Sequence, residues 1–368
     1  MRYILKLFLS VCILFLIQVT SVSAEPNVSS QYFCLVDKKS GQVLYEKNMD
    51  EQRPVASTTK IMTAILTMEY MNLSEIATVS AKADRTPEVT IGLREGQELT
   101  VGELLKVTLI RSANDAAVVL AEHIAGDEDF FGELMTRKAI ALGAFNTQFK
   151  NASGLPNKEH FSTAYDLSII SRYALKHDYI KETVKKEKAE FKHPGYSKPI
   201  TIKNTNTLLG SFPGADGIKT GTTNAAGKCL VASATRDQHQ LITVVLRSPD
   251  RKGDSARLLS YGFNNFYLEK IVDNQQPFKE AIVIGGTENY VEVIPNDEIY
   301  IWSSGSLKNI EKKTIMKYSL EAPVSYGNKV GFLEVYAYDK KLAKVDLVAK
   351  NDIEQEKNVL LRILSSFF

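Results

Sequence analysis

The spacing of apolar residues changes twice along the chain, and each change predicts a different kind of structure. Two short apolar runs within residues 31–47 flank Lys39-Ser40-Gly41, a pattern typical of a β-hairpin. From Ser57 to about residue 175, apolar residues recur mostly at helical spacing. After residue 200, short β-like runs return. The pattern therefore predicts strands at both ends of a helical block.

Start and stop signals mark several helices of that block. Thr100 and Glu103 form a capping box ahead of one apolar stripe, and Thr163 with Asp166 forms a similar pair. Glycines stand where two stripes end. We expect helices after Ser57, after Thr100, over 115–124 ending at Gly126, over 130–142 ending at Gly143, and after Thr163.

The late strand runs occupy residues 218–223, 228–235 and 241–246 and are joined by short hairpin connections. Hairpin connections make neighbouring strands antiparallel. The hairpin at 31–47 must meet these strands across the helical block to form one sheet. The predicted fold class is α/β, an antiparallel sheet flanked by helices with a helical subdomain.

A polar break at residues 274–277 separates this part from a β-rich C-terminal region. The runs beyond the break contain no candidate catalytic cluster. We predict a catalytic domain at 25–272 and a small all-β domain at 277–350. The expected strand runs are 281–284, 290–294, 299–302, 314–320, 330–338 and 343–348.

Both ends of the chain carry amphipathic or apolar segments outside these domains. Arg2 and Lys6 flank the start of an apolar run at 7–17, and Val22-Ser23-Ala24 offers a cleavage site, as in an export signal. The run is short for a bilayer span, so we expect cleavage after Ala24, with an uncleaved anchor as the alternative. Residues 351–368 carry an apolar helical stripe. That segment predicts either a membrane-associating helix or a helix packed on the β domain.

Charge and cysteine content narrow the function classes. The whole chain has 45 basic and 43 acidic residues, and loss of residues 1–24 removes Arg2 and Lys6 but no acid. The remaining charges balance, so the chain has no electrostatic footprint for nucleic acid. Cys34 and Cys229 lie in apolar, β-branched runs typical of buried free thiols, although export would permit a disulfide. The histidines are scattered without metal-ligand spacing, so we predict neither a metal nor another cofactor.

The first candidate motif is Ser57-Thr58-Thr59-Lys60 at the start of a predicted helix. Residues three apart share a helix face, so the Ser57 hydroxyl and the Lys60 amine can touch. A lysine activates a serine only when burial or a second cation lowers its pKa. The Ser57 N–H, free at a helix start, can face an oxyanion. Alone, a Ser-x-x-Lys pattern is common by chance, and a solvated helix N-cap is its usual explanation.

Two further motifs follow. Ser112 of Ser112-Ala113-Asn114 can pass a proton between Lys60 and a leaving amine, and Asn114 can hold substrate backbone; an ordinary N-cap is the alternative. Lys219-Thr220-Gly221-Thr222 lies in a strand run, where an edge strand of ordinary polar residues is the alternative. Lys219 can serve as the second cation, and Thr220 can bind a terminal carboxylate. Gly221 allows close backbone approach, and the Thr222 N–H can complete an oxyanion hole.

The three motifs in this order resemble the low-molecular-mass penicillin-binding proteins, the serine-type D-alanyl-D-alanine carboxypeptidases. The resemblance spans roughly residues 30–270, and the β-rich region is similar in placement to that family's C-terminal domain. It looks closest to enzymes of spore-forming Gram-positive bacteria, some of which trim spore cortex. The stretches that carry the resemblance are 54–64, 111–117, 149–155 and 216–221.

The resemblance implies a function and a location. Ser57 would form an acyl-enzyme from the D-Ala-D-Ala end of peptidoglycan stem peptides, with Lys60 as base, and β-lactams would acylate the same serine. Arg251 would help to bind the terminal carboxylate, although the loop at 247–250 departs from the family pattern. The enzyme would act at the outer face of the cytoplasmic membrane, in the cell wall, or in the intermembrane space of the forespore.

Three alternatives use the same residues. A class A β-lactamase needs a glutamate in a Glu-x-x-Leu-Asn loop, and no pentapeptide of this pattern occurs between Asn114 and Lys219. An endopeptidase would cut after D-Ala in cross-linked peptides, and the same sequence motifs are expected for it as for a carboxypeptidase. A catalytically silent module would only bind cell-wall peptide.

Overall fold

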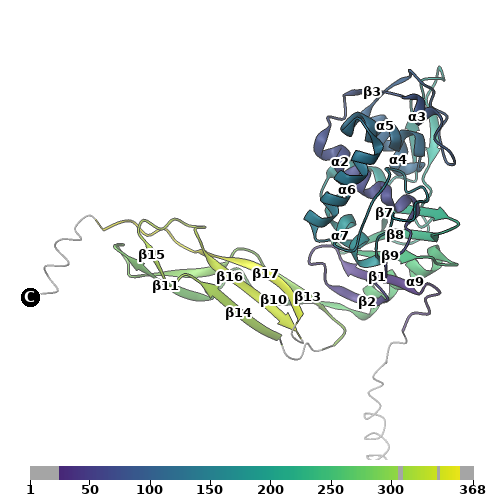
Figure 1. The fold of residues 1–368 in the computed structure, drawn as a ribbon. Helices are drawn as coiled ribbons and strands as arrows, with labels where there is room; N and C mark the ends of the chain where they lie inside the picture. Colours follow the sequence, from purple (N-terminus) through teal and green to yellow (C-terminus); the bar gives the residue numbers. More distant parts are fainter. Residues whose placement is uncertain (1–24, 306–309, 338–339, 357–368) are drawn as a thin grey trace, which may run out of the picture.

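The computed structural model describes residues 25–305, 310–337 and 340–356. The predicted export signal lies outside these ranges, as do residues 357–368 of the C-terminal stripe. Residues 351–356 form no helix and contribute bridge residues Ile353 and Gln355. Figure 1 shows the helices gathered on a sheet in one body and the C-terminal strands in a second, elongated body.

One antiparallel sheet forms the centre of the first body. Its strand order is β2-β1-β9-β8-β7, so the N-terminal hairpin joins the strands that follow the helical block. Cys34 of β1 lies opposite Val244 of β9. The predicted fold class is confirmed. The strands are β1 (Tyr32–Asp37), β2 (Val43–Lys47), β7 (Ala215–Thr223), β8 (Gly227–Arg236) and β9 (His239–Leu246).

Alternation along β1 shows why the sheet is covered on both faces. Cys34 and Val36 join the large core formed with the helical block, whereas Phe33 and Leu35 join a second core that includes Leu258 of α9. Successive side chains of a strand point to opposite faces. The sheet is therefore buried between the helical block and α9 (Arg251–Asn265).

The helical block follows the predicted caps. Thr100 Oγ1 accepts a 3.2 Å hydrogen bond from Glu103 N, and Gly126 and Gly143 adopt left-handed φ values of 74° and 92° at two helix ends. The block comprises η1 (Ala56–Thr59), α2 (Lys60–Tyr70), α3 (Ala81–Asp84), α4 (Val101–Ile110), α5 (Asn114–Ala125), α6 (Glu128–Leu142), α7 (Ala164–Ala174) and α8 (Asp178–Val184). Two small ribbons flank it: β3 (Ile76–Thr78) with β4 (Glu98–Thr100), and β5 (Lys188–Phe191) with β6 (Ile200–Lys203).

The C-terminal body has its own core, which includes Val293, Leu333 and Leu347. A two-stranded sheet pairs β10 (Tyr267–Val272) with β13 (Ile299–Ser303). A six-stranded sheet has the order β14-β16-β17-β12-β11-β15. Its strands are β11 (Lys279–Ile284), β12 (Tyr290–Pro295), β14 (Ile310–Met316), β15 (Ser319–Glu321), β16 (Lys329–Ala337) and β17 (Lys340–Ala349).

The four strands of the small ribbons were not expected, and two assignments near the C-terminal region also differ from the sequence pattern. The expected run at 314–320 is divided between β14 and β15, which pair with different neighbours. β10 was not expected because it directly follows α9 without a turn signal. Its pairing with β13 places residues 267–272 with the C-terminal strands.

Gln42 and Trp302 join the two bodies. The Gln42 side chain donates to the Trp302 carbonyl at 2.7 Å and accepts from the Trp302 N–H at 2.9 Å. The Trp302 ring is buried among Phe33 and other residues of the α9 side of the central sheet. This side-chain amide therefore links the backbone of β13 to the β1–β2 hairpin. Among the described residues, no helix is both long and apolar enough to cross a membrane.

Candidate active site

Ser57 and Lys60 meet where η1 passes into α2. Ser57 lies in η1, and Lys60 is the first residue of α2. Lys60 Nζ lies 3.0 Å from Ser57 Oγ, and Lys60 has no exposed surface. The N-cap residues of η1 and α2 are Val55 and Thr59, so Ser57 is not a solvated helix N-cap, the alternative reading of the motif.

Two carbonyl oxygens orient the Lys60 amine. Nζ donates to Asn114 Oδ1 and to the Ser153 carbonyl, each at 2.7 Å. Neither carbonyl oxygen can donate a proton, so both must receive N–H bonds. In the neutral amine only two N–H groups remain, and the lone pair is left for the Ser57 hydroxyl. Burial, followed by repulsion from Lys219, holds the pKa of Lys60 well below its usual value.

The Asn114 side chain binds Lys60 and does not cap its own helix. It begins α5, whose N-cap residue Ala113 makes no side-chain capping bond. Its amide nitrogen donates to the Pro87 carbonyl at 3.2 Å, which directs Oδ1 to Lys60. The alternative of an ordinary N-cap is therefore wrong for Asn114. Ser112 stands two residues earlier, buried and with φ at 69°, and its Oγ has no hydrogen-bond partner among the described residues.

The third motif lies on β7, the edge strand of the central sheet. Lys219 is 1% exposed and donates to the Thr220 carbonyl at 3.1 Å. Burial, with repulsion from Arg251 as the smaller cause, lowers the pKa of Lys219 to about 7. Thr220 Oγ1 lies 2.6 Å from Thr205 Oγ1, so this hydroxyl has a fixed neighbour.

Gly221 brings β7 against the nucleophile's own turn. A Cβ at Gly221 would lie 2.9 Å from the Val55 carbonyl oxygen and 3.0 Å from the Ser57 nitrogen. Such separations are too short for any side chain. The approach of η1 thus requires this glycine, in addition to the close approach of substrate expected from the sequence.

Arg251 reaches the same strand from the start of α9. Its Nη1 donates to the Gly221 carbonyl at 2.9 Å and to Thr222 Oγ1 at 2.8 Å. The loop before it departs from the expected pattern, yet the guanidinium still lies beside the third motif. A fixed cation here can attract a carboxylate.

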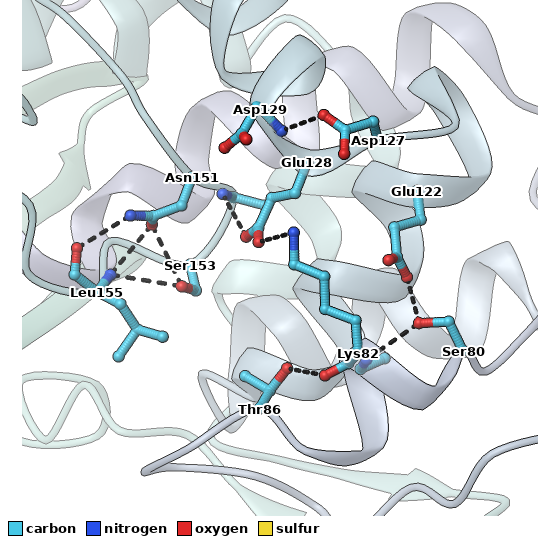
Figure 2. Close-up of polar contacts among 12 residues, drawn as sticks. Ser80, Lys82, Thr86, Glu122, Asp127, Glu128, Asp129, Asn151, Ser153 and Leu155 are labelled. Carbon is cyan, nitrogen blue, oxygen red and sulfur yellow. Dashed lines mark hydrogen bonds and ion pairs between the residues drawn. The ribbon is translucent and has the colours of Figure 1, made fainter.

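The loop at 151–155 lies outside the three motifs, yet it supplies a carbonyl to Lys60. Figure 2 shows Asn151 beside Ser153 and Leu155, where its Oδ1 accepts from the Leu155 N–H at 3.1 Å. The same oxygen accepts from the Gly154 N–H at 2.7 Å. Glu128 Oε1 accepts from Ala152 N at 3.2 Å and pairs with Lys82. These bonds position the Ser153 carbonyl that binds Lys60. Asn before a Ser-Gly turn was the available sequence signal.

A cavity of about 710 Å³ opens beside η1. Its lining includes Ala56, Gly154, His160 and Thr223, so it lies next to Ser57 between the 154–160 loop and the end of β7. The described residues contain no group of three or more His, Cys, Asp or Glu side chains placed to hold a metal ion. Cys34 and Cys229 are buried free thiols.

Comparison with known families decides the chemistry. The model of peptidase family S11, D-alanyl-D-alanine carboxypeptidase, matches residues 18–250, and the model of the penicillin-binding protein 5 C-terminal domain matches residues 266–355. The chain belongs to peptidase family S11. It is a serine-type D-alanyl-D-alanine carboxypeptidase with the family's all-β C-terminal domain. The β-lactamase and silent-module alternatives are therefore set aside.

Individual relatives agree with this assignment. The D-alanyl-D-alanine carboxypeptidase DacF of Bacillus subtilis is 32% identical over 331 residues, covering 87% of this chain and 85% of DacF. The structure of PBP3 from Streptococcus pneumoniae, titled a peptidoglycan synthesis regulatory factor, gives a TM-score of 0.79 at 28% identity, covering 89% of this chain and 100% of that one. Penicillin-binding protein D2 of Listeria monocytogenes, solved in an ampicillin-bound form, gives a TM-score of 0.58 at 31% identity, covering 64% of this chain and 98% of that one.

Proposed function

We propose that this S11 carboxypeptidase removes the terminal D-Ala of peptidoglycan pentapeptides through an acyl-enzyme on Ser57. The contact that carries the proposal is the 3.0 Å approach of Lys60 Nζ to Ser57 Oγ. Because two carbonyl groups occupy the other N–H groups of Lys60, the amine lone pair is aimed at the nucleophile.

The acylation step assigns one role to each motif. Neutral Lys60 takes the Ser57 proton while Oγ bonds to the carbonyl carbon of the penultimate D-Ala. The Ser57 and Thr222 N–H groups donate hydrogen bonds to the negatively charged oxygen that forms. Ser112 then relays the proton from Lys60 to the leaving nitrogen, and the C–N bond breaks to release D-Ala. Water then attacks the carbonyl carbon of the acyl-enzyme and gives up its proton, the bond from that carbon to Ser57 Oγ breaks, and the shortened peptide is released.

The substrate's terminal carboxylate is proposed to bind at β7. Thr220 offers a hydroxyl, and Lys219 and Arg251 supply positive charge. Arg251 is already oriented by its bond to Thr222 Oγ1. Lys219 also lowers the pKa of Lys60, so the same cation serves binding and activation.

We extend the proposal to inhibition and location. β-Lactams should acylate Ser57, which the ampicillin-bound form of the Listeria relative supports. Residues 1–24 would direct export to the cell wall or to the outer face of the cytoplasmic membrane, and residues 357–368 would contact that membrane. A role in sporulation follows from the resemblance to enzymes of spore-forming bacteria. Fractionation of a chain ending at Asn358 tests the membrane contact, since that chain should become soluble.

The central test is covalent labelling with a fluorescent penicillin. The purified protein should be labelled, and Ser57→Ala should not. D-Ala release from a synthetic pentapeptide should disappear in the same variant, with its folding checked by thermal unfolding. Full labelling of Ser57→Ala would refute the assignment of the nucleophile. Parallel assays on cross-linked dimers separate carboxypeptidase from endopeptidase activity.

A further inference from the structure

His160 is a buried histidine that none of the three motifs contains. It is 4% exposed and packs its ring edge-on against Phe149, with the ring centroids 5.4 Å apart. The neighbouring residues Phe161 and Ser162 form isolated β-bridges with Gln148 and Arg53. Those bridges fix the His160 segment beside the chain that leads to Ser57.

The two ring nitrogens of His160 have different partners. Nδ1 lies 3.2 Å from the Lys150 N–H, which can only donate. Nδ1 must therefore carry the lone pair, and the proton resides on Nε2. Nε2 lies 2.8 Å from Thr59 Oγ1 and donates to it. The tautomer of His160 is thus set from outside the active site.

Thr59 connects His160 to Ala56, the residue before the nucleophile. Its hydroxyl, already an acceptor from His160, donates to the Ala56 carbonyl at 2.7 Å. That carbonyl belongs to the Ala56–Ser57 peptide, whose N–H is the Ser57 N–H. In a trans peptide the C=O and N–H point in opposite directions across one rigid plane. Holding the Ala56 oxygen therefore aims the Ser57 N–H.

Two glycines leave this peptide room on both sides. A Cβ at Gly154 would lie 2.0 Å from the Ala56 oxygen, and one at Gly221 would lie 3.0 Å from the Ser57 nitrogen. Ala56 itself adopts φ 48°, a left-handed conformation that an alanine does not favour. The turn needs an external constraint to hold this conformation.

We propose that His160 is a positioning residue for acyl transfer, which through Thr59 fixes the Ala56–Ser57 peptide and aims the Ser57 N–H at the developing oxyanion. The inference rests on the proposed role of Ser57 as nucleophile. His160 is not a general base in this scheme. Burial and the nearby Lys60 lower its pKa to about 4, so the ring stays neutral during turnover.

A pair of substitutions separates positioning from simple packing. In His160→Gln, the side-chain amide nitrogen stands near the position of Nε2 and can donate to Thr59. In His160→Asn, the side-chain oxygen stands near the position of Nδ1 and keeps the Lys150 bond but does not reach Thr59. We expect His160→Gln to retain most of the penicillin acylation rate. His160→Asn should lose about 10- to 100-fold, the scale of an impaired oxyanion donor.

The kinetic pattern provides a second readout. The loss in His160→Asn should appear in kcat for D-Ala release, with KM much less changed, because the N–H is needed mainly in the transition state. Thermal unfolding of both variants serves as the control for packing. Equal acylation by the two variants, or losses that follow their stabilities, would overturn the proposal.

Thr59 supplies an independent test should either histidine variant fold poorly. Thr59→Ser keeps the hydroxyl, whereas Thr59→Val keeps the shape and removes it. Acylation should survive in the first and fall in the second, and combining Thr59→Val with His160→Asn should add little further loss. Equal rates for the two Thr59 variants would contradict the relay. Absence of labelling in the unmodified protein would instead reject the role of Ser57.

Discussion

Asn114 Oδ1 accepts a 2.7 Å hydrogen bond from Lys60 Nζ, and this bond determines where the lysine lone pair points. An amide oxygen carries no net charge, so it orients the amine while stabilising the ammonium form less than a carboxylate would. The site thereby combines a lowered lysine pKa with a fixed geometry.

Asn114→Asp replaces the neutral acceptor with a carboxylate of the same shape. The negative charge should stabilise the Lys60 ammonium and raise its pKa, because opposite charges favour the charged form. Penicillin acylation at neutral pH should fall by about tenfold or more, equivalent to a pKa rise of about one unit or more. The rate should recover at higher pH. An unchanged pH profile would show that Lys60 is not the base.

The pH dependence of turnover follows from two lysines with opposite requirements. Lys60 must be neutral to act as base, so activity should fall as pH drops through its lowered pKa. Lys219 must be charged to attract a carboxylate, so substrate binding should weaken as pH rises above about 7. We expect KM for a D-Ala-D-Ala peptide to rise on the alkaline side. A KM that stays flat to pH 9 would contradict this role.

Arg251→Gln tests the coupling between the two cations on β7. Arg251 lowers the pKa of Lys219 by repulsion, so its removal should move the alkaline rise in KM to higher pH. KM at neutral pH should increase because one cation is lost from the carboxylate site. Arg257→Gln is a matched control, since Arg257 pairs with Asp250 and Asp254 instead. An alkaline limb that does not move in Arg251→Gln would exclude the coupling.

Gly154→Ala should destabilise the protein far more than an ordinary glycine substitution. Its added Cβ would lie 2.0 Å from the Ala56 oxygen, whereas Gly96, with φ of 80° against 81° at Gly154, has no neighbour within 4 Å. Gly96→Ala should cost about 1 kcal/mol for the left-handed backbone alone. Gly154→Ala should cost about 2 to 3 kcal/mol more through overpacking. Chemical unfolding of both variants measures the difference, and equal losses would contradict the clash.

Gln42→Ala should loosen the junction between the two bodies without affecting acylation. The substitution removes both bonds to the Trp302 backbone, each contributing about 1 kcal/mol. Trp302 is the chain's single tryptophan, so its emission reports the junction directly. We expect easier quenching and an unchanged penicillin acylation rate. Gln52→Ala, at an exposed glutamine of the same body, should leave the emission as it is.

The local structure followed from the sequence because its causes are local. Thr100 with Glu103, and the glycines at 126 and 143, act within one helical turn, and the helices begin and end where these residues predict. The apolar runs at 32–36 and 241–246 predicted strands, and the structure shows that side chains on both faces of those strands are buried. Ser57 and Lys60 meet because residues three apart share a helix face.

Only the tertiary structure brought the remaining site residues together. The partners that orient Lys60 lie 54 and 93 residues away, and the Thr59–His160 contact spans 101 residues. No local rule links such positions, because their approach depends on how the helices and strands pack. The spacing of Ser57 and Lys60 therefore came from the sequence. The burial that lowers the pKa of Lys60, the approach of Arg251 and the constraint from His160 came from packing.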